Sequence, residues 1–155
     1  MPAGKIALLA MMLSISVAGM AADDPLLGTW KLNVAKSKFD PGPPPKSAIR
    51  TCSQQGNAIK MTQQEIDGQG KPTPWEYTAS FDGKDFPVKG DPGRDTVSWK
   101  RLDPHTIEGA SKKAGKTTNT FRWIISQDGK TLTATVKGVN AQGQAVNNFT
   151  VFDKQ

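Results

Sequence analysis

The sequence predicts an all-β protein, an antiparallel up-and-down β-barrel of about 8–10 strands. Turn-forming pairs such as Gly56-Asn57, Asp82-Gly83 and Asp128-Gly129 recur every 9 to 15 residues, the spacing of short strands joined by hairpins. Between these turns, apolar and polar residues alternate with period two, which gives each strand one face for a core and one for water. After residue 21, no helix-length segment has a 3.6-residue apolar period.

Ten candidate strands follow one another along the chain. They lie near residues 28–34, 47–55, 58–66, 73–81, 85–89, 96–102, 106–113, 117–126, 131–139 and 145–152. Closure into a barrel removes edge strands, and few of these segments carry the Pro or Lys that protects an edge, so a barrel is favoured over two packed sheets. Pro87 is the exception, and it marks 85–89 as an edge strand, a bulge or a short irregular piece.

The first 21 residues have the pattern of a secretory signal peptide. Lys5 precedes an apolar stretch from Ile6 to Ala18, and Gly19-Met20-Ala21 places small residues at the −3 and −1 positions of a cleavage site. Cleavage after Ala21 leaves one domain over residues 22–155, and the protein is expected to be exported, either periplasmic or secreted. After residue 21 no apolar run exceeds three or four residues, which excludes a transmembrane helix.

Composition argues against several classes of function. The formal net charge is +6, and it becomes +5 without the signal peptide because Lys5 is lost. The aromatic residues share strand faces with Leu, Ile and Val instead of alternating with exposed Lys, so no nucleic-acid partner is predicted. One His and one Cys are too few for a zinc site, and His105 alone does not make a catalytic arrangement. We therefore expect no metal, no cofactor, no catalytic residue and no enzyme activity.

Cys52 cannot form an internal disulfide because the chain has a single Cys. It is therefore either buried and inert or paired between chains. The one long connection, residues 35–46, contains four Pro and is expected to be stiff and extended. This segment either covers one end of the barrel, with Phe39 inserted, or runs over the surface as a loop.

The segment Leu27-Gly28-Thr29-Trp30-Lys31-Leu32-Asn33 carries the Gly-x-Trp motif, followed by Lys36-Ser37-Lys38-Phe39 and the Pro-rich stretch. In these features the chain resembles exported bacterial lipocalin-like, calycin-type β-barrel proteins. The resemblance implies a barrel whose interior can hold a small, mostly apolar molecule. It also implies that Trp30 closes the barrel floor against an Arg late in the chain, for which Arg101 and Arg122 are the candidates.

The aromatic side chains of the core lead to two interpretations: they fill the barrel, or several of them line a cavity. In the second, the protein is an exported soluble barrel that binds a small hydrophobic or amphiphilic ligand. Arg101 shares strand parity with Trp99, so it is either a structural cap on Trp30 or an anchor for a carboxylate. The alternative function is a non-catalytic structural or interaction protein of the cell envelope with a filled barrel, and an enzyme comes third. The predicted ligand-binding residues are Trp75, Tyr77, Phe81, Trp99, Arg101 and Trp123.

Overall fold

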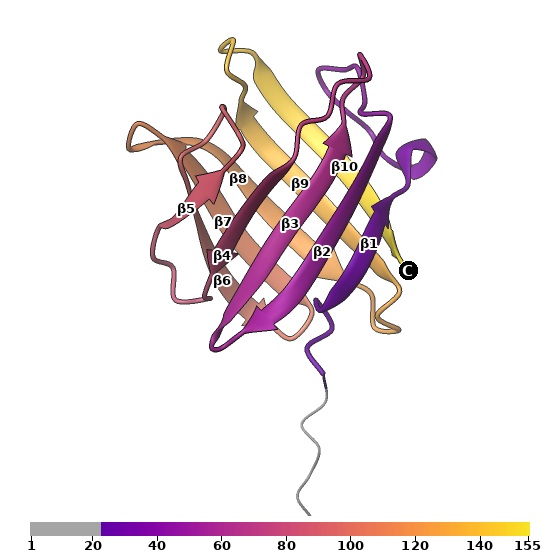
Figure 1. The fold of residues 1–155 in the computed structure, drawn as a ribbon, viewed down its shortest axis with the longest axis vertical. Coiled ribbons are helices and arrows are strands. Elements are labelled where there is room, and N and C mark those ends of the chain that lie inside the picture. The colour runs from indigo at the N-terminus through magenta and orange to yellow at the C-terminus, as the bar shows by residue number, and fades with distance from the viewer. Residues whose placement is uncertain (1–22) are drawn as a thin grey trace, which may run out of the picture.

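The computed structural model describes residues 23–155, which form a closed antiparallel barrel of ten strands (Figure 1). The strands are β1 (Gly28–Leu32), β2 (Ser47–Gln55), β3 (Ala58–Ile66), β4 (Trp75–Ala79), β5 (Phe86–Lys89), β6 (Thr96–Asp103), β7 (Thr106–Lys113), β8 (Lys116–Ile125), β9 (Thr131–Val139) and β10 (Ala145–Lys154). Each strand pairs with its neighbours in sequence, and β1 closes the barrel by pairing with β10. The predicted fold class is confirmed, and the strand boundaries differ from the predicted ones by a few residues at most. The predicted signal peptide, residues 1–21, lies outside the described residues.

The period-two alternation sets which side chains face inward. On β1 Trp30 and Leu32 are buried while Lys31 is exposed, and the register places Trp30 opposite Arg50 on β2 and Lys154 on β10. The strand ends at Leu32, earlier than the alternation predicts, because the Asn33 side chain accepts a hydrogen bond from the Lys36 backbone amide. That contact caps a single 3₁₀ turn, η1 (Val34–Lys36).

Strand β5 is the weakest part of the barrel wall. It pairs with β4 at two positions and with β6 at two more, whereas β2 and β3 pair along nine positions. Pro87 lacks a backbone N–H and cannot donate to a ladder, which is the reason that β5 stays short. The segment was expected to be an edge strand, a bulge or a short irregular piece; Phe86–Lys89 is instead a short strand that pairs with β4 and β6, so the expectation of an edge is wrong.

The two ends of the barrel differ in packing. At the lower end in Figure 1, the residues before β1 turn under the barrel, with Leu26 fully buried and the Trp30 indole nitrogen donating to its carbonyl at 2.9 Å. Further fully buried side chains fill the interior above this floor: Ile59, Met61, Val97, Trp99, Ile107, Ile125 and Leu132. The opposite end carries the Pro-rich segment, the β3–β4 connection and the β9–β10 turn (Figure 1).

Trp30 does lie at the floor of the barrel, but the cation over its ring belongs to Lys154. The Lys154 ammonium group is 5.0 Å from the ring centroid and 3.4 Å from the Pro25 carbonyl oxygen. Arg101 instead lies over Phe81, and Arg122 faces outward beside Glu108, 3.4 Å away. Neither arginine expected from the resemblance takes that position. Over residues 23–155, no helix is long and apolar enough to cross a membrane.

Candidate functional site

The upper half of the barrel encloses a cavity of about 450 Å³. One side of it is mostly apolar and is made by β1, β8, β9, β10 and the segment after β1. The apolar residues on this side are Leu32, Phe39, Phe121, Trp123, Ala134, Val136, Val139, Val146 and Phe152, and the polar residues among them are Asn119, Asn148 and Thr150. The mouth is bordered by loop residues, including Pro41, Pro43, Pro45, Gly68, Asn140 and Ala141. The Pro-rich segment therefore contributes to the mouth of the cavity, and Phe39 is half-buried against the core.

The opposite side of the cavity is polar, and Arg50 lies at its centre. Arg50 follows the inward parity of Ala48 and Cys52 on β2 and is 6% exposed. Its Nε and Nη2 donate to the Gln63 Oε1 at 3.0 and 2.8 Å, and Gln63 Nε2 donates to Glu65 Oε2 at 2.7 Å. The guanidinium group also lies 4.4 Å from the Trp123 ring centroid and 4.3 Å from that of Phe152. Arg50 therefore connects the polar side to the apolar one.

Burial changes the protonation equilibria of this chain of side chains. Desolvation lowers the pKa of Arg50, and it raises the pKa of Glu65 by more than the Gln63 hydrogen bond and the Arg50 charge lower it. A raised pKa means that Glu65 gives up its proton less readily than a carboxyl group in water. The polar side thus combines a cation whose charge is costly to bury with an acid that is shifted toward its neutral form.

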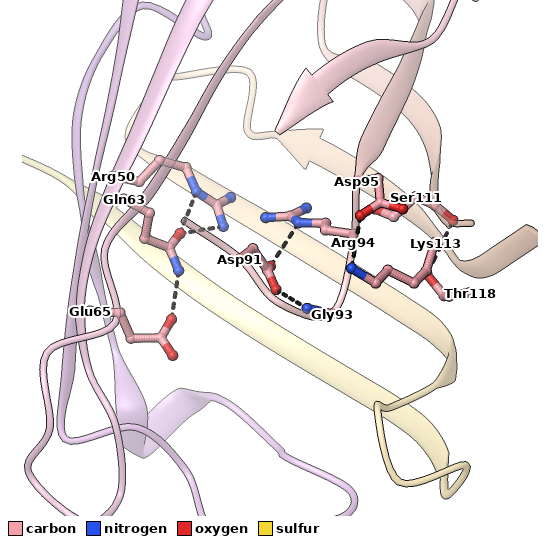
Figure 2. Close-up of polar contacts among 10 residues, drawn as sticks. All are labelled: Arg50, Gln63, Glu65, Asp91, Gly93, Arg94, Asp95, Ser111, Lys113 and Thr118. Carbon is pink, nitrogen blue, oxygen red and sulfur yellow. Dashed lines mark hydrogen bonds and ion pairs between the residues drawn. The ribbon is translucent and has the colours of Figure 1, made fainter. Parts of the chain in front are cut away.

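A second arginine, Arg94, enters the cavity from the loop between β5 and β6. Its Nε donates to Asp91 Oδ2 at 2.8 Å, and Asp91 Oδ1 also accepts from the Gly93 amide at 2.8 Å. The guanidinium group lies over the Trp75 ring, 4.0 Å from its centroid. Figure 2 shows it extending away from Asp91 toward Arg50.

The far side of the same loop is fixed by Asp95. Its carboxylate accepts from the Lys113 ammonium group at 2.8 Å (Figure 2). It also accepts from the Ala114 backbone amide at 2.7 Å. These hydrogen bonds lower the pKa of Asp95, the Ala114 amide contributing most. Asp95 therefore attaches this end of the loop to the β7–β8 hairpin, and Asp91 holds the Arg94 guanidinium group from within the loop.

Three of the six predicted ligand-binding residues line this cavity: Trp75, Tyr77 and Trp123. The other three lie in the packing below it. Trp99 is fully buried and contacts the rings of Tyr77, Phe81 and Trp123, with centroid distances of 5.1 to 5.5 Å. Phe81 lies 5.1 Å from Trp99, beneath the guanidinium group of Arg101.

Arg101 holds the closed end of the barrel together. Its Nη2 donates to Asp24 Oδ2 at 2.7 Å and its Nη1 to the Pro104 carbonyl oxygen at 2.9 Å. Arg101 shares a strand face with Trp99, as its position in the alternation predicts. It lies at the closed end of the barrel, however, and does not line the cavity. Of the two roles that parity allowed, a cap and an anchor, these contacts are those of a cap, although Phe81 and not Trp30 lies beneath the guanidinium group.

The polar residues Arg50, Gln63, Glu65 and Arg94 were not predicted as site residues. Three of them continue the inward parity of buried neighbours, since Arg50 alternates with Cys52 and Gln63 alternates with Met61. The alternation along β2 and β3 could therefore have identified these three residues as inward-facing from the sequence. Arg94 lies in a loop, where no periodicity indicates the direction of a side chain.

His105 and Cys52 do not line the cavity. His105 is in the β6–β7 turn at the closed end, with Nδ1 3.1 Å from the Ile125 carbonyl oxygen. Cys52 is buried, and burial raises its pKa to about 12. Within residues 23–155, no three His, Cys, Asp or Glu side chains are grouped as ligands for a metal ion.

Comparison with known proteins shows the fold and leaves the family open. No family model and no curated protein matches the sequence. Among solved structures, the chain is similar to Rv2717c from M. tuberculosis, with a TM-score of 0.55 and 16% identity over 84% of this chain and 93% of that one. It is also similar to zebrafish ileal bile acid-binding protein in complex with cholic acid, with a TM-score of 0.50 and 14% identity over 84% of this chain and 99% of that one. At these identities the likeness concerns the barrel fold alone.

Proposed function

We propose that this protein is an exported, non-catalytic binder of a small hydrophobic or amphiphilic molecule. The observation that carries the proposal is the cavity of about 450 Å³ in the upper half of the barrel, with an apolar wall on one side and a polar one on the other. Its volume is within the range of about 300–1,000 Å³ that is usual for small-molecule sites. A molecule with a polar head and an apolar body matches both walls.

The arrangement also bears on the filled-barrel alternative. The lower half of the interior is filled by side chains such as Trp99 and Met61, as that alternative requires. The upper half instead holds the cavity, and the inward positions of β2 and β3 there carry Arg50, Gln63 and Glu65. The similar barrel of the zebrafish protein holds cholic acid, which supports the proposal by analogy of fold.

Tryptophan fluorescence offers a direct test, because Trp75 and Trp123 line the cavity while Trp30 and Trp99 are fully buried elsewhere. We expect saturable changes in emission when long-chain fatty acids, fatty alcohols or bile acids are added to the mature protein. These changes should disappear in a Trp75→Phe/Trp123→Phe double variant. Emission that stays constant across the whole panel would contradict ligand binding and would leave the structural role as the better account.

Native mass spectrometry of protein purified from its own compartment tests the proposal without a chosen ligand. A co-purifying small molecule that is displaced by fatty acids supports binding. The same spectrum tests export, since cleavage after Ala21 gives a polypeptide that begins at Ala22. A mass that includes residues 1–21 in the exported fraction would contradict the predicted cleavage.

A further inference from the structure

The polar wall of the cavity carries hydrogen-bond donors that the described residues do not satisfy. Arg50 Nη1 is buried and has no hydrogen-bond partner within residues 23–155, although Nε and Nη2 of the same group are both bound to Gln63. The Tyr77 hydroxyl group is also buried, and it too lacks a partner there. Buried donors of this kind are costly, which makes them informative about what the cavity is built to hold.

The second guanidinium group lies close to these donors. Figure 2 shows the guanidinium groups of Arg94 and Arg50 pointing toward one another. The positive charge of Arg94 adds to the effect of burial in lowering the pKa of Arg50. The guanidinium carbon of Arg94 is 5.8 Å from the Tyr77 ring centroid, so the phenol ring lies beside this cation. Burial raises the pKa of Tyr77, and the charges of both arginines oppose that rise. Two like charges held this close favour an anion between them.

Three carboxylates, those of Glu65, Asp67 and Asp91, line the cavity together with the two arginines, but none of them is paired with Arg50. Asp91 is bound to Arg94 Nε and to the Gly93 amide, and Asp67 at the mouth accepts from the backbone amides of Gln69 and Lys71. Glu65 reaches Arg50 only through Gln63, and burial raises its pKa. No carboxylate of the described residues forms an ion pair with Arg50, so its charge is the least compensated in the cavity.

We propose that the cavity selects amphiphiles with a single carboxylate head, which Arg50 and Arg94 bind from two sides while the Tyr77 hydroxyl group donates a third hydrogen bond. The apolar body of the ligand lies along the wall made by Phe121, Trp123 and Val136. Guanidinium groups suit a carboxylate because their parallel N–H donors match its two oxygens. This inference rests on the proposed function and specifies the chemistry of the ligand.

Three probes of equal chain length test the inference: dodecanoate, dodecan-1-ol and dodecylammonium, each below its critical micelle concentration at pH 8. Their affinities are measured by tryptophan fluorescence titration and by calorimetry. We expect dodecanoate to bind about tenfold to a hundredfold more tightly than dodecanol, the range of one or two charge-assisted hydrogen bonds. Dodecylammonium should bind more weakly than the alcohol.

The variants Arg50→Met and Arg94→Gln should each remove most of the preference for dodecanoate while dodecanol continues to bind. Arg94→Gln changes a loop position, so it keeps the test valid if Arg50→Met folds poorly. Arg122→Gln is the matched control, because Arg122 faces outward beside Glu108 and its loss lowers the net charge by the same amount. The control should retain the full preference.

The outcomes separate the inference from the function on which it rests. If none of the three probes binds, the proposed function itself fails. If dodecanol binds as tightly as dodecanoate, or if both arginine variants keep the preference, binding stands and the arginine anchor is wrong. If dodecylammonium binds most tightly, the carboxylates at the mouth determine the selectivity and the inference is overturned.

Discussion

Arg50 and Arg101 both occupy inward-facing positions of the barrel, yet replacing each with Met should have opposite consequences. Arg101 is part of the packing that closes the lower end, whereas Arg50 lies in the cavity beside groups that a ligand would contact. Methionine keeps most of the unbranched stem in both cases and removes the charge. The pair of variants therefore separates an arginine that stabilises the fold from one that serves binding.

For Arg101→Met we expect the free energy of unfolding to fall. The variant loses the hydrogen bonds to Asp24 and Pro104 and the interaction with the Phe81 ring, 4.2 Å from the guanidinium carbon to the centroid. The side chains of Arg101 and Asp24 are 20% and 24% exposed, so solvent screens the ion pair in part. Allowing for that screening, the hydrogen bonds and the cation–π interaction together give a loss of about 1–3 kcal/mol. Ligand affinity should not change.

For Arg50→Met we expect the reverse. The guanidinium group loses its hydration on folding, and within residues 23–155 neither an ion pair nor a partner for Nη1 offsets that cost, so removing the charge relieves it. The methionine stem and sulfur can pack against the Trp123 and Phe152 rings in place of the guanidinium group. Gln63 lies at the cavity, where water can hydrogen bond to its freed oxygen. Unfolding free energy should stay within about 1 kcal/mol of the original or rise, while dodecanoate affinity falls.

Urea denaturation followed by tryptophan fluorescence measures the first quantity, with the m-value as a check that both variants unfold as the original does. Fluorescence titration with dodecanoate measures the second. If Arg50→Met lost several kcal/mol and kept its affinity, Arg50 would be a structural residue. If Arg101→Met kept its stability and lost affinity for dodecanoate, Arg101 at the closed end would be the binding residue.

Three other residues lead to further predictions. Gly109→Ala should lower the unfolding free energy by about 1–3 kcal/mol in urea denaturation, because a Cβ there would meet the Phe121 ring and the Ser98 carbonyl oxygen; unchanged stability would contradict this packing. Cys52, whose pKa is raised to about 12 by burial, should resist a thiol reagent at pH 8 until urea unfolds the protein, and rapid labelling of the folded protein would refute that. Burial raises the pKa of Glu65, so stability should fall as pH rises from the ordinary carboxyl pKa, about 4.3, through the raised value. Over the same pH interval the affinity for dodecyl sulfonate should fall. The Glu65→Gln variant should lose the pH dependence of both stability and affinity. If that variant kept the original pH profiles, Glu65 would not be the group responsible.

The barrel itself could be predicted from the sequence because its signals are local. Alternation along each strand and Gly- or Asn-containing turns depend on neighbouring residues, and they located all ten strands. Pro87 indicated correctly that β5 does not pair along its whole length, since a residue without a backbone N–H cannot extend a hydrogen-bond ladder. The interaction of Lys154 with Trp30 was not predictable, because it depends on how the last strand closes against the first.

The site was harder to predict because parity gives the direction of a side chain and not its height in the barrel. Trp75 and Trp99 both point inward, yet one lines the cavity and the other fills the core below it. The height follows from strand tilt and register, which the sequence does not show directly. Arg50 could have been found by extending the parity of Cys52, but Arg94 depends on a loop conformation that Asp91 and Asp95 create together.

A crystal structure of residues 22–155 with 12-bromododecanoate tests whether an anionic amphiphile binds inside the barrel, because the bromine atom can be located by its anomalous scattering. The account predicts a bromine peak inside the barrel against the wall of Phe121, Trp123 and Val136, with the carboxylate between the guanidinium groups of Arg50 and Arg94. A bromine peak only on the outer surface, or a carboxylate at the mouth that touches neither arginine, would contradict it.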